Sequence, residues 1–570
     1  MKIKKYILGL FALSMTLVSC NDLLDKEPLD QQTNNPAYWN IESNVQSQVN
    51  KFYEDFIGYG TGSDGNFYFN TLTDDQVHSQ SFQNWKFVNV PASSGEWTNN
   101  YTQIRRANTI IAGVEQSELS NEKKAHYIGI ARLMRANSYY KLVRAFGNVT
   151  YSDKVLDLTD EDVLYGKRND RDEVMDKVLE DLNYACTNIA ENASRLEFSR
   201  QMANALKADI CLWEGTFRKY RTIDENGKGQ DMTGAKKFLE ACVDACTYVM
   251  GKGYSLNKSY QENYIAESLN GNPEMIMYKA YKQGYYMHSM ADWTASSTEI
   301  SGMTKDAFDS YLFKDGKPLA LTSEDTKIIA TPDANGDMNI SAMLAIRDKR
   351  LSETTDPVIY YTHHEWKRAG AMQMHSSTGY GVCKYDNTTF AVNDRTVAGK
   401  SYNDAPIFWL AVIYVNLAEA KAELGTLTQA DLDNTINKLY ARAELPPLSL
   451  NVGFKDPAND MDVSDIIWEI RRCRRCELMF DNNYRYWDLI RWHQLDKLDT
   501  QKNPDIQLGA DIANEPDAAI KAEHIKAGTT YYDASQGGQI RTFDKKHYLY
   551  PIPSGQISLN PQLGQNPGWE

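Results

Sequence analysis

The segment "RRCRRCELMFDNNYRYWDLIRW", residues Arg471–Trp492, is the densest run of chemically distinctive side chains in this chain of 570 residues. It holds six arginines, two cysteines and five aromatic residues. Three kinds of element have such a composition: a nucleic-acid patch, a metal or redox site, and a structural part of the fold. Charge, cysteine spacing and helical periodicity distinguish between them.

The charge of this segment argues against nucleic acid. From residue 469 to residue 491 the six arginines stand beside four carboxylates, so the local formal charge is only +2, in a chain of formal net charge −15. On a helix, positions 471, 472, 474 and 475 spread over much of the circumference, whereas a phosphate backbone needs one basic face. Glu469 precedes Arg472 by three residues and Arg474 precedes Glu477 by three, a spacing that pairs charges within a helix. We therefore expect a buried network of arginines and carboxylates between packed helices, and no nucleic-acid partner.

The cysteine pair of the segment, Cys473 and Cys476, has the spacing of half a zinc site. A structural zinc ion takes four ligands, and the nearest histidine, His493, stands alone. A redox pair normally lies between a strand and a helix, whereas these cysteines continue an apolar helical stripe. The sequence therefore predicts no metal or redox site here.

No catalytic motif is recognisable in the rest of the sequence, which lacks a Walker loop, a GxGxxG after a strand and a GxSxG elbow. His363-His364-Glu365 lacks the one-turn histidine spacing of the metalloprotease motif, and no carboxylate pair is singled out for glycosidase chemistry. Residues 333–344, "DANGDMNISAML", resemble a calcium loop only loosely, because Leu344 stands where a bidentate glutamate is needed. We predict no catalytic residue and no cofactor, with a structural calcium ion left as an alternative.

Hydrophobic periodicity predicts a mostly α-helical protein. In residues 121–146 apolar side chains recur every three to four positions, and Gly147 marks the end of that helix. Equivalent patterns predict helices at residues 39–57, 97–118, 171–192, 199–221, 232–251, 405–425, 428–443, 463–481 and 484–497. Helices that follow one another in pairs are typical of a tetratricopeptide-like superhelix, which is the scaffold we expect.

Residues 252–400 interrupt the helical pattern. They are rich in Gly, Tyr, Ser, Asp and Thr, and they are too long for a structureless linker inside a compact protein. We expect an irregular, loop-rich subdomain with short strands, one of them at Glu274–Tyr278. Residues 58–96 form a second loop-rich segment.

The N-terminus has the pattern of a lipoprotein signal. Three lysines within the first five residues precede an uncharged apolar stretch from residue 6 to residue 18, which is too short to span a membrane. The tetrapeptide "LVSC" at residues 17–20 resembles a bacterial lipobox. The pattern predicts a signal peptide at residues 1–19, lipidation of Cys20 and a leader at residues 20–38; the alternative is a secretory signal with an incidental cysteine. Two or three acyl chains on Cys20 tether a protein to a membrane without embedding it.

Seven cysteines remain when Cys20 is set apart. Their odd number means that at least one is unpaired. Four of them fall in stretches with a helical pattern, where a small apolar side chain fits, so we expect most to be buried free thiols.

The segments "ELMF" and "RYWDLIRW", Glu477–Phe480 and Arg485–Trp492, follow an arginine-rich helix and resemble the signature of the SusD/RagB family, outer-membrane nutrient-binding lipoproteins of Bacteroidetes. Three other stretches agree in the same order along the chain: the lipobox, "ARLMRANSYYKLVRAFG" at residues 131–147 and "YPIPSGQISLNPQLGQNPGW" at residues 550–569. Two departures fall at turns. The connection Asp481–Tyr484 is one residue longer than usual, and Thr150 stands where the family has proline.

The resemblance implies a tetratricopeptide-like helical scaffold with an irregular region that carries the ligand site. It implies a SusC-like TonB-dependent transporter as partner, and non-catalytic capture of an oligosaccharide for delivery to it. It also implies a lipid anchor in the outer membrane, with the protein facing the cell exterior. We accordingly divide the chain into a signal peptide (1–19), a lipidated leader (20–38), a SusD-like helical region (39–251), a ligand-binding subdomain (252–400) and the signature region (401–570).

Sugar binding needs flat aromatic faces beside planar polar groups, and loops commonly supply both. The chain has 35 Tyr and 11 Trp against 18 Phe, a mix suited to polar ligands. From the loop-rich segments we expect ligand contacts from Asp74, Asn84, Trp85, Tyr285, Tyr286, Trp293, Trp366 and Arg368. Trp85 is the expected main platform, because it lies in a polar loop with no helical stripe to join.

Two other function classes stay open at this point. Aromatic loops serve peptide or glycopeptide capture equally well, and a surface glycosidase is the third class. The signature segment itself is expected to support the fold and not to touch the ligand. Changes at Arg485 or Asp488 should therefore act on binding only through stability.

Overall fold

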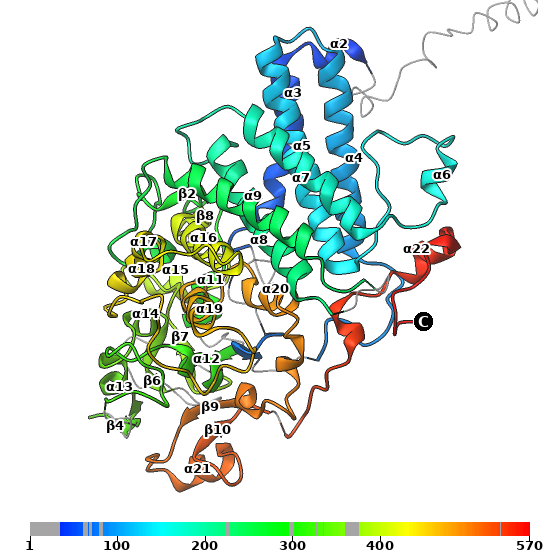
Figure 1. The fold of residues 1–570 in the computed structure, drawn as a ribbon. Helices are drawn as coiled ribbons and strands as arrows, with labels where there is room; N and C mark the ends of the chain where they lie inside the picture. The colour runs from blue at the N-terminus through cyan, green and yellow to red at the C-terminus, as the bar shows by residue number, and fades with distance from the viewer. Residues whose placement is uncertain are drawn as a thin grey trace, which may run out of the picture.

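The computed structural model describes residues 35–60, 67, 71–78, 84–222, 228–295, 301–324, 329–334, 336–359, 376–535 and 537–570. In Figure 1 the helices α3, α4, α5 and α7 form the upper part of the view, and the strands β4, β6, β7, β9 and β10 lie in the lower part. The fold is mostly helical, with a few short antiparallel strand pairs. The predicted fold class is thereby confirmed.

The scaffold is a series of long helices in which each one packs against its neighbours in the series. The last helix of the series, α16, comes from the C-terminal third of the chain and packs on α9. This arrangement is that of stacked helical pairs, as the periodicity predicts. The series consists of α4 (Gly95–Gln116), α5 (Asn121–Phe146), α7 (Arg171–Asn188), α8 (Arg200–Tyr220), α9 (Met232–Met250) and α16 (Leu410–Glu423).

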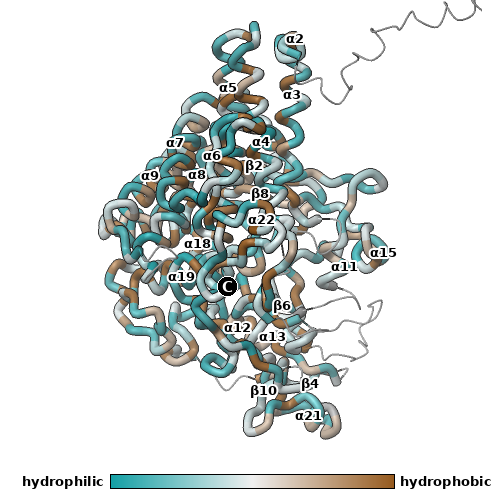
Figure 2. The backbone as a smooth tube through the Cα atoms, turned by 90° about the vertical axis from the view of Figure 1, so that its right-hand side faces the viewer, coloured by the Kyte–Doolittle hydropathy of each residue, from teal (hydrophilic) through white to brown (hydrophobic). Residues whose placement is uncertain are grey.

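Local sequence fixes where these helices begin and end. Ser120, Ser199 and Asp231 accept hydrogen bonds from backbone amides in the first turns of α5, α8 and α9, which satisfies donors that have no partner inside the helix. Gly147 ends α5 with a φ of +72°, a conformation that glycine adopts without strain. Apolar and polar residues alternate along the scaffold helices (Figure 2). Among the residues that the structure describes, no helix is both long enough and apolar enough to cross a membrane.

Buried arginine–carboxylate pairs cross the seams between scaffold helices. Arg135 of α5 donates to both carboxylate oxygens of Asp181 of α7, at 2.7 and 2.8 Å. Arg171 of α7 donates in the same way to Glu214 of α8, at 2.9 and 2.6 Å. All four side chains are buried. Because a two-pronged pair tolerates little rotation, each one fixes how its two helices sit against each other.

The segment Arg471–Trp492 folds as α19 (Asp465–Glu477), a tight turn and α20 (Tyr484–Arg491). This connection has left-handed backbone at Phe480, Asn482 and Asn483, with φ of +67°, +46° and +55°. Asparagine tolerates this conformation better than most residues do. The extra residue of the connection is thus accommodated by side chains suited to it.

The arginines of this segment lie in the predicted buried network. Arg491 of α20 donates to both oxygens of Glu419 of α16, at 2.7 and 2.8 Å. Arg474 of α19 donates to Asp488 of α20 at 2.7 Å. All four side chains are buried. The interpretation of the segment as a structural element, in which guanidinium groups bind carboxylates of neighbouring helices, is confirmed.

The two cysteines of the segment are buried and free. Burial raises the pKa of the Cys473 thiol to about 12 and that of the Cys476 thiol to about 11, so both stay protonated and neither is a ready metal ligand. The other cysteines of the described residues are also free thiols, and most of them are buried, as predicted.

The strands of the described residues are short and pair antiparallel. The pairing of β1 with β3 joins the first loop-rich segment to the irregular subdomain, and β2 confirms the strand predicted there. The pairs are β1 (Gln76–His78) with β3 (Ser301–Met303), β2 (Met275–Lys279) with β8 (Ala405–Trp409), and β9 (Leu508–Asp511) with β10 (Tyr531–Asp533). A four-stranded sheet contains β4 (Thr331–Pro332), β5 (Met338–Asn339), β6 (Thr355–Ile359) and β7 (Tyr380–Val382).

One helix prediction is wrong at its start. Residues 405–425 were expected to be helical throughout, but Ala405–Trp409 form β8 and the helix begins at Leu410. All five residues of β8 are buried. A short apolar run of this kind fits a buried strand as well as a helix, and its pairing with β2 decides between them.

The remaining helices are short. In the N-terminal half they are α2 (Pro36–Trp39), α3 (Glu42–Asn50), η3 (Lys51–Asp55), α6 (Glu161–Leu164), α10 (Glu262–Ile265) and α11 (Met290–Ala295). Later come α12 (Lys305–Ser310), α13 (Ser341–Ala345), α14 (Lys349–Ser352), α15 (Val392–Thr396), α17 (Gln429–Asn434) and α18 (Ile436–Arg442). The last are η4 (Leu495–Leu498), η5 (Pro504–Gln507), α21 (Ala518–His524), η6 (Lys545–Tyr548), α22 (Ser554–Leu559) and η7 (Pro561–Leu563).

Candidate functional site

Two of the expected ligand-binding residues lie on one tight turn of the irregular subdomain, which we call the tyrosine turn (Tyr281–Tyr286). Lys282 and Tyr286 exchange backbone hydrogen bonds across it, at 2.8 and 3.0 Å. Gly284 has a φ of +77°, which favours glycine at this point of the turn. The turn carries Tyr285 with 83% of its surface exposed and Tyr286 with 42% exposed. Two neighbouring aromatic side chains thus face solvent on a short, hydrogen-bonded loop.

The exposed tyrosines rest on a column of rings that reaches into the core. The Tyr286 ring is parallel to that of Tyr281, with centroids 5.0 Å apart and an interplanar angle of 2°. Tyr281 in turn stacks on the buried Tyr59, at 6.2 Å. The Tyr281 hydroxyl donates to the Ile57 carbonyl at 3.2 Å and accepts from the Tyr59 amide at 3.1 Å. The position of Tyr286 is therefore set by packing and hydrogen bonds beneath it.

A buried histidine braces this column. The His288 ring lies 4.6 Å from that of Tyr281 and 4.9 Å from that of Tyr59. Its Nδ1 accepts from the Met290 amide and its Nε2 donates to the Asn403 carbonyl, at 3.1 and 3.0 Å. Burial lowers the pKa of His288 to about 3, so the ring is neutral at physiological pH. These partners give His288 a structural role.

A buried carboxylate holds the start of the turn. Asp404 accepts hydrogen bonds from the Tyr281 and Leu269 amides, at 2.8 and 2.9 Å. Burial raises the pKa of Asp404 to about 6, against the lowering effect of these amides. The turn is thus tied to the scaffold side through β8, whose first residue follows Asp404.

Amide, carboxylate and ammonium groups lie on and beside the tyrosine turn. Gln283 is exposed and donates to Asp394 of α15 at 3.1 Å. The ammonium groups of Lys282 and Lys279 lie 4.8 Å from the Tyr285 ring and 5.4 Å from the Tyr286 ring. Amide, carboxylate and ammonium groups beside aromatic faces are the combination that sugar hydroxyls and sugar rings require.

Asn84 and Trp85 line a different site, a cavity of about 460 Å³ that α20 and its preceding turn also line. Trp85 is only 8% exposed. Its ring stacks on His547 at 4.0 Å and its Nε1 donates to the Thr542 carbonyl at 2.8 Å. A main platform needs an open ring face, and here one face is covered and the indole N–H is already bound. The expectation that Trp85 is the main platform does not fit this burial.

Asp74 also departs from its expected role. It has no exposed surface and accepts from Arg485 with both carboxylate oxygens, at 2.8 and 2.6 Å. Burial opposes its ionisation, but the guanidinium groups of Arg475 and Arg485 outweigh burial and hold the pKa of Asp74 well below its usual range. In this structure Asp74 belongs to the buried network of the signature segment and presents nothing to a ligand.

The other expected residues lie as follows. Trp293 is half-buried on α11, which follows the tyrosine turn in the chain. Trp366 and Arg368, like Cys20, lie outside the residues that the structure describes. The residues compared with a calcium loop, 333–344, contain the turn between β4 and β5. There the Asp333 amide donates to the Asp337 carbonyl at 2.8 Å, and the Asp337 amide donates to the Asp333 carboxylate at 3.1 Å. Among the described residues, no group of three or more His, Cys, Asp or Glu side chains is placed to hold a metal ion.

The sequence points to Tyr285 and Tyr286 at the exposed end of the ring column, but not to Tyr281 and Tyr59 beneath them. Tyr281 precedes Tyr285 by four residues in the same loop, and no periodicity links it to Tyr59, which lies 222 residues away. The run "YKQGYY" at residues 281–286 is nevertheless a usable signal, because a glycine between tyrosines marks a turn that presents them.

Comparisons with known proteins agree with the fold. A family model described as "SusD family" matches residues 255–569, and one described as "Starch-binding associating with outer membrane" matches residues 22–212. The chain is 26% identical over 214 residues to a SusD-like protein of Bacteroides ovatus, a match that spans only 37% of each chain. It is 24% identical to SusD-like protein P38 of Formosa agariphila, over 83% of this chain and 88% of that one.

A solved structure, that of a SusD-like carbohydrate-binding protein from Bacteroides fragilis, superposes with a TM-score of 0.71. That match covers 92% of this chain and all of the other at 20% identity. At such identity the superposition establishes a shared architecture, and the positions that contact a ligand must be argued from this chain.

Proposed function

Because this chain belongs to the SusD family, we propose that it is a non-catalytic surface protein that binds a glycan on the tyrosine turn. Proteins of this family that bind glycans do so without catalysis. The observation that carries the proposal for this chain is the exposure of Tyr285 and Tyr286, 83% and 42%, on a turn braced from below.

The physical reason is preorganisation. A single exposed aromatic residue is ordinary on a protein surface. Two neighbouring tyrosines on a turn fixed by hydrogen bonds, one of them stacked on a column of rings, lose little conformational entropy when a sugar ring settles on them. The polar ends of Gln283, Asp394 and Lys282 supply donors and acceptors at the edge of that platform.

The proposal includes attachment to the outer membrane through acyl chains on Cys20. The lipobox at residues 17–20 supports it, and so does the description of the family model that begins at residue 22. Replacing Cys20 with serine should move the protein from the membrane fraction to the soluble fraction of cells. Unchanged fractionation of Cys20→Ser would leave the secretory-signal alternative.

A SusC-like TonB-dependent transporter is the proposed partner, to which the bound oligosaccharide is delivered. The family resemblance of the chain supports this partner, since the resemblance implies delivery of the captured ligand to such a barrel. Detergent-solubilised membranes that contain the full chain should yield a complex with an outer-membrane barrel on affinity purification. Recovery of the chain alone, in detergents that preserve membrane complexes, would count against the partnership.

The test of the binding function is titration of the chain with a panel of oligosaccharides, α-1,4-glucan, β-1,3-glucan, xylan and fructan fragments, followed by calorimetry. Product analysis of the same mixtures accompanies it. Binding of at least one of these without any product is the expected result. Release of shorter products would instead support a glycosidase, and binding of peptides with no binding of any glycan would support the peptide-capturing alternative.

A further inference from the structure

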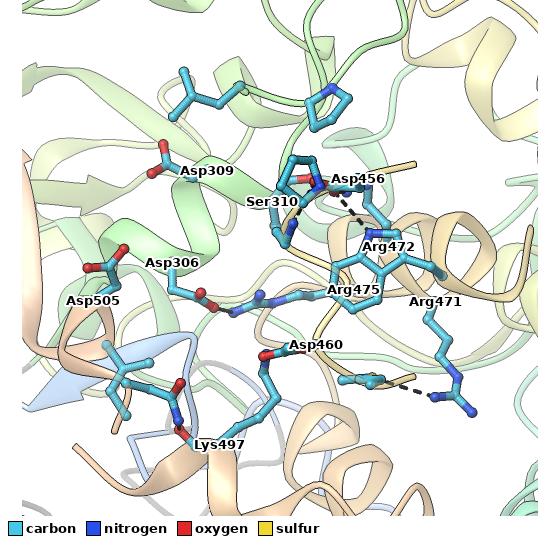
Figure 3. A pocket seen from close by; sticks show the side chains of 18 of the residues that line it. Asp306, Asp309, Ser310, Asp456, Asp460, Arg471, Arg472, Arg475, Lys497 and Asp505 are labelled. Carbon is cyan, nitrogen blue, oxygen red and sulfur yellow. Dashed lines mark hydrogen bonds and ion pairs between the residues drawn. The ribbon is translucent and has the colours of Figure 1, made fainter. Parts of the chain in front are cut away.

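A second cavity lies away from the tyrosine turn, against one face of α19. Its volume is about 670 Å³, which is within the range of roughly 300–1,000 Å³ typical of small-molecule sites. Helix α12, the loop Pro318–Ala320, the loop Asp456–Met461 and the segment Lys497–Ile506 complete its walls. We name it the α19 cavity. Figure 3 shows Asp306, Asp309 and Asp505 on one side of it and Arg472 and Arg475 facing them.

The charges that line the α19 cavity are nearly balanced, with six basic and five acidic side chains. Arg475 pairs with Asp306 at 2.7 Å and Lys497 pairs with Asp460 at 2.6 Å. Arg472 pairs with Asp456. A cavity whose charges already neutralise one another gains little from a strongly charged ligand, because such a ligand must break existing pairs. The lining therefore favours a neutral ligand.

The paired carboxylates of the rim keep acceptor capacity. Lys305 pairs with Asp309 at 2.8 Å and with Asp505 at 3.0 Å. The side chains of Asp309, Asp460 and Asp505 are still 25%, 46% and 49% exposed. A carboxylate has about four lone-pair positions, so each can accept hydrogen bonds from hydroxyl groups while its ion pair persists. The neutral ligand that such a rim suits is polyhydroxylated.

An oriented indole stands beside these polar groups. Trp468, in the first turn and a half of α19, is half-buried and lines the cavity. Its Nε1 donates to Asp456 at 3.0 Å, and the guanidinium of Arg472 lies 5.7 Å from the centroid of its ring. Because its polar edge is bound to the protein, the ring is held in one orientation with apolar carbon beside the cavity. Aliphatic side chains, among them Met461 and Leu319, extend that apolar surface.

We propose that the α19 cavity is a second carbohydrate-binding site, which takes a neutral sugar or the end of a neutral oligosaccharide. A sugar ring packs on Trp468, and its hydroxyls donate to Asp309, Asp460 and Asp505. The proposal rests on the proposed glycan-binding function and adds to it a site built by the signature helix. The expectation that the segment Arg471–Trp492 supports the fold and does not touch the ligand is kept, because the proposed sugar contact, Trp468, lies three residues before that segment.

The test uses the double variant Tyr285→Ala/Tyr286→Ala, which lacks both ring faces of the tyrosine turn. Binding of the same panel of neutral oligosaccharides is measured by isothermal titration calorimetry. Residual binding is expected, and adding Trp468→Ala should weaken it about tenfold or more, the effect of losing an aromatic stacking surface. Trp468→Phe keeps a ring face and should retain most of the affinity. Thermal unfolding of each variant shows whether it is folded. Should Trp468→Ala fail to fold, Asp460→Ala on the exposed rim replaces it and should also weaken the residual binding.

The outcomes separate the two proposals. If the wild-type chain binds a glycan and the double tyrosine variant binds none, the α19 cavity is not a sugar site, whereas the proposed function stands. Residual binding that a folded Trp468→Ala variant leaves unchanged overturns the cavity site in the same way. If wild-type affinity depends on Trp468 and not on the tyrosines, the cavity site stands and the tyrosine turn is rejected as platform. A wild-type chain that binds no oligosaccharide of the panel overturns both.

Discussion

The buried network around α19 and α20 and the tyrosine turn differ in where their polar side chains lie: those of the network are buried, and those at the tip of the turn are exposed. In the network, Arg491, Glu419 and Asp488 are buried, and Arg491 donates hydrogen bonds to both carboxylates. On the tyrosine turn, Tyr285 is 83% exposed and no scaffold helix covers it. The donors and acceptors of the network bind one another inside the fold, whereas the exposed side chains of the tyrosine turn face the solvent, where a ligand can contact them.

This difference is the reason why we propose that the residues that identify the family are not those that bind the ligand. A bidentate pair such as Arg491–Glu419 fixes the angle between two helices, so it depends on the architecture and on no particular ligand. The tyrosine turn depends on the architecture only at its base, through Tyr281 and Asp404. Its tip is free to differ among proteins with the same scaffold. The following predictions test this division.

The largest effect is expected from breaking the network. Arg491→Leu leaves Glu419 buried without its bidentate partner, and removal of one member of a buried ion pair costs about 3–5 kcal/mol. The free energy of unfolding, measured by denaturant titration, should fall by that amount. Lys236→Ala, which breaks the exposed pair with Glu240, is the matched control and should cost no more than about 1 kcal/mol. Equal losses for the two variants would mean that the network is not what holds these helices.

The same pair predicts a pH dependence. Burial disfavours ionisation of Glu419, but Arg491, Arg471 and Arg474 outweigh it and lower its pKa to about 2, against about 4.3 in an unfolded chain. Its stabilising contribution is therefore complete above the unfolded value and is lost as the pH falls toward the folded value. The difference in unfolding free energy between wild type and Glu419→Gln should be about 3 kcal/mol at neutral pH and shrink between about pH 4.5 and pH 2.

Glu240→Gln on the exposed face of α9 is the control for this pH series and should show no comparable trend. A penalty for Glu419→Gln that stays constant down to about pH 3 would contradict the assignment. At that pH the unfolded chain already binds a proton at Glu419 that the folded chain does not, so the stabilising contribution should have begun to fall.

A smaller loss of stability is expected from a substitution at Trp85. This substitution tests whether Trp85 stabilises the fold or binds the ligand. Trp85→Phe removes the indole N–H and leaves the Thr542 carbonyl without its donor, at a cost of about 1–2 kcal/mol of stability. The affinity for glycan should stay the same, because the ring is covered by His547. A folded Trp85→Phe variant with normal stability and weakened binding would restore Trp85 as the platform.

The smallest effect on stability is expected at the tip of the tyrosine turn. Tyr285→Ala removes a side chain that is 83% exposed, and surface changes of this kind stay within about 0.5 kcal/mol. Differential scanning calorimetry should show an unfolding transition close to that of the wild type. A loss of several kcal/mol would mean that Tyr285 stabilises the fold, and it would contradict the contrast between the buried network and the tyrosine turn.

Much of the scaffold follows from the sequence, because its helices carry strong periodicity and distinct ends. The pattern at residues 121–146 gives α5 with the bounds that the structure has, and Gly147 ends it. The start of α16 does not follow, since Ala405–Trp409 becomes a strand only because β2 lies beside it. A pairing between segments about 130 residues apart leaves no periodic trace in either one.

The site is less predictable for a related reason. Composition and loop character point correctly to a place where Tyr285 and Tyr286 are exposed, but they cannot tell an exposed aromatic residue from one that packs under the C-terminal segment. Trp85 and Tyr285 lie in similar polar loops. Trp85 is buried because His547, more than 400 residues further along the chain than Trp85, stacks on it, whereas Tyr285 is exposed. Burial of a loop residue depends on long-range contacts, which single-sequence reasoning does not supply.

The most direct test of the division between fold and binding compares two variants of the tyrosine turn in one calorimetric titration series. Tyr285→Phe/Tyr286→Phe keeps both ring faces, and Tyr285→Ala/Tyr286→Ala removes them. With an oligosaccharide that binds the wild-type chain, the phenylalanine variant should bind within a few-fold of wild type, and the alanine variant should lose at least about tenfold in affinity at this site with an unchanged unfolding transition. An alanine variant that is stably folded and binds with wild-type affinity would contradict the account.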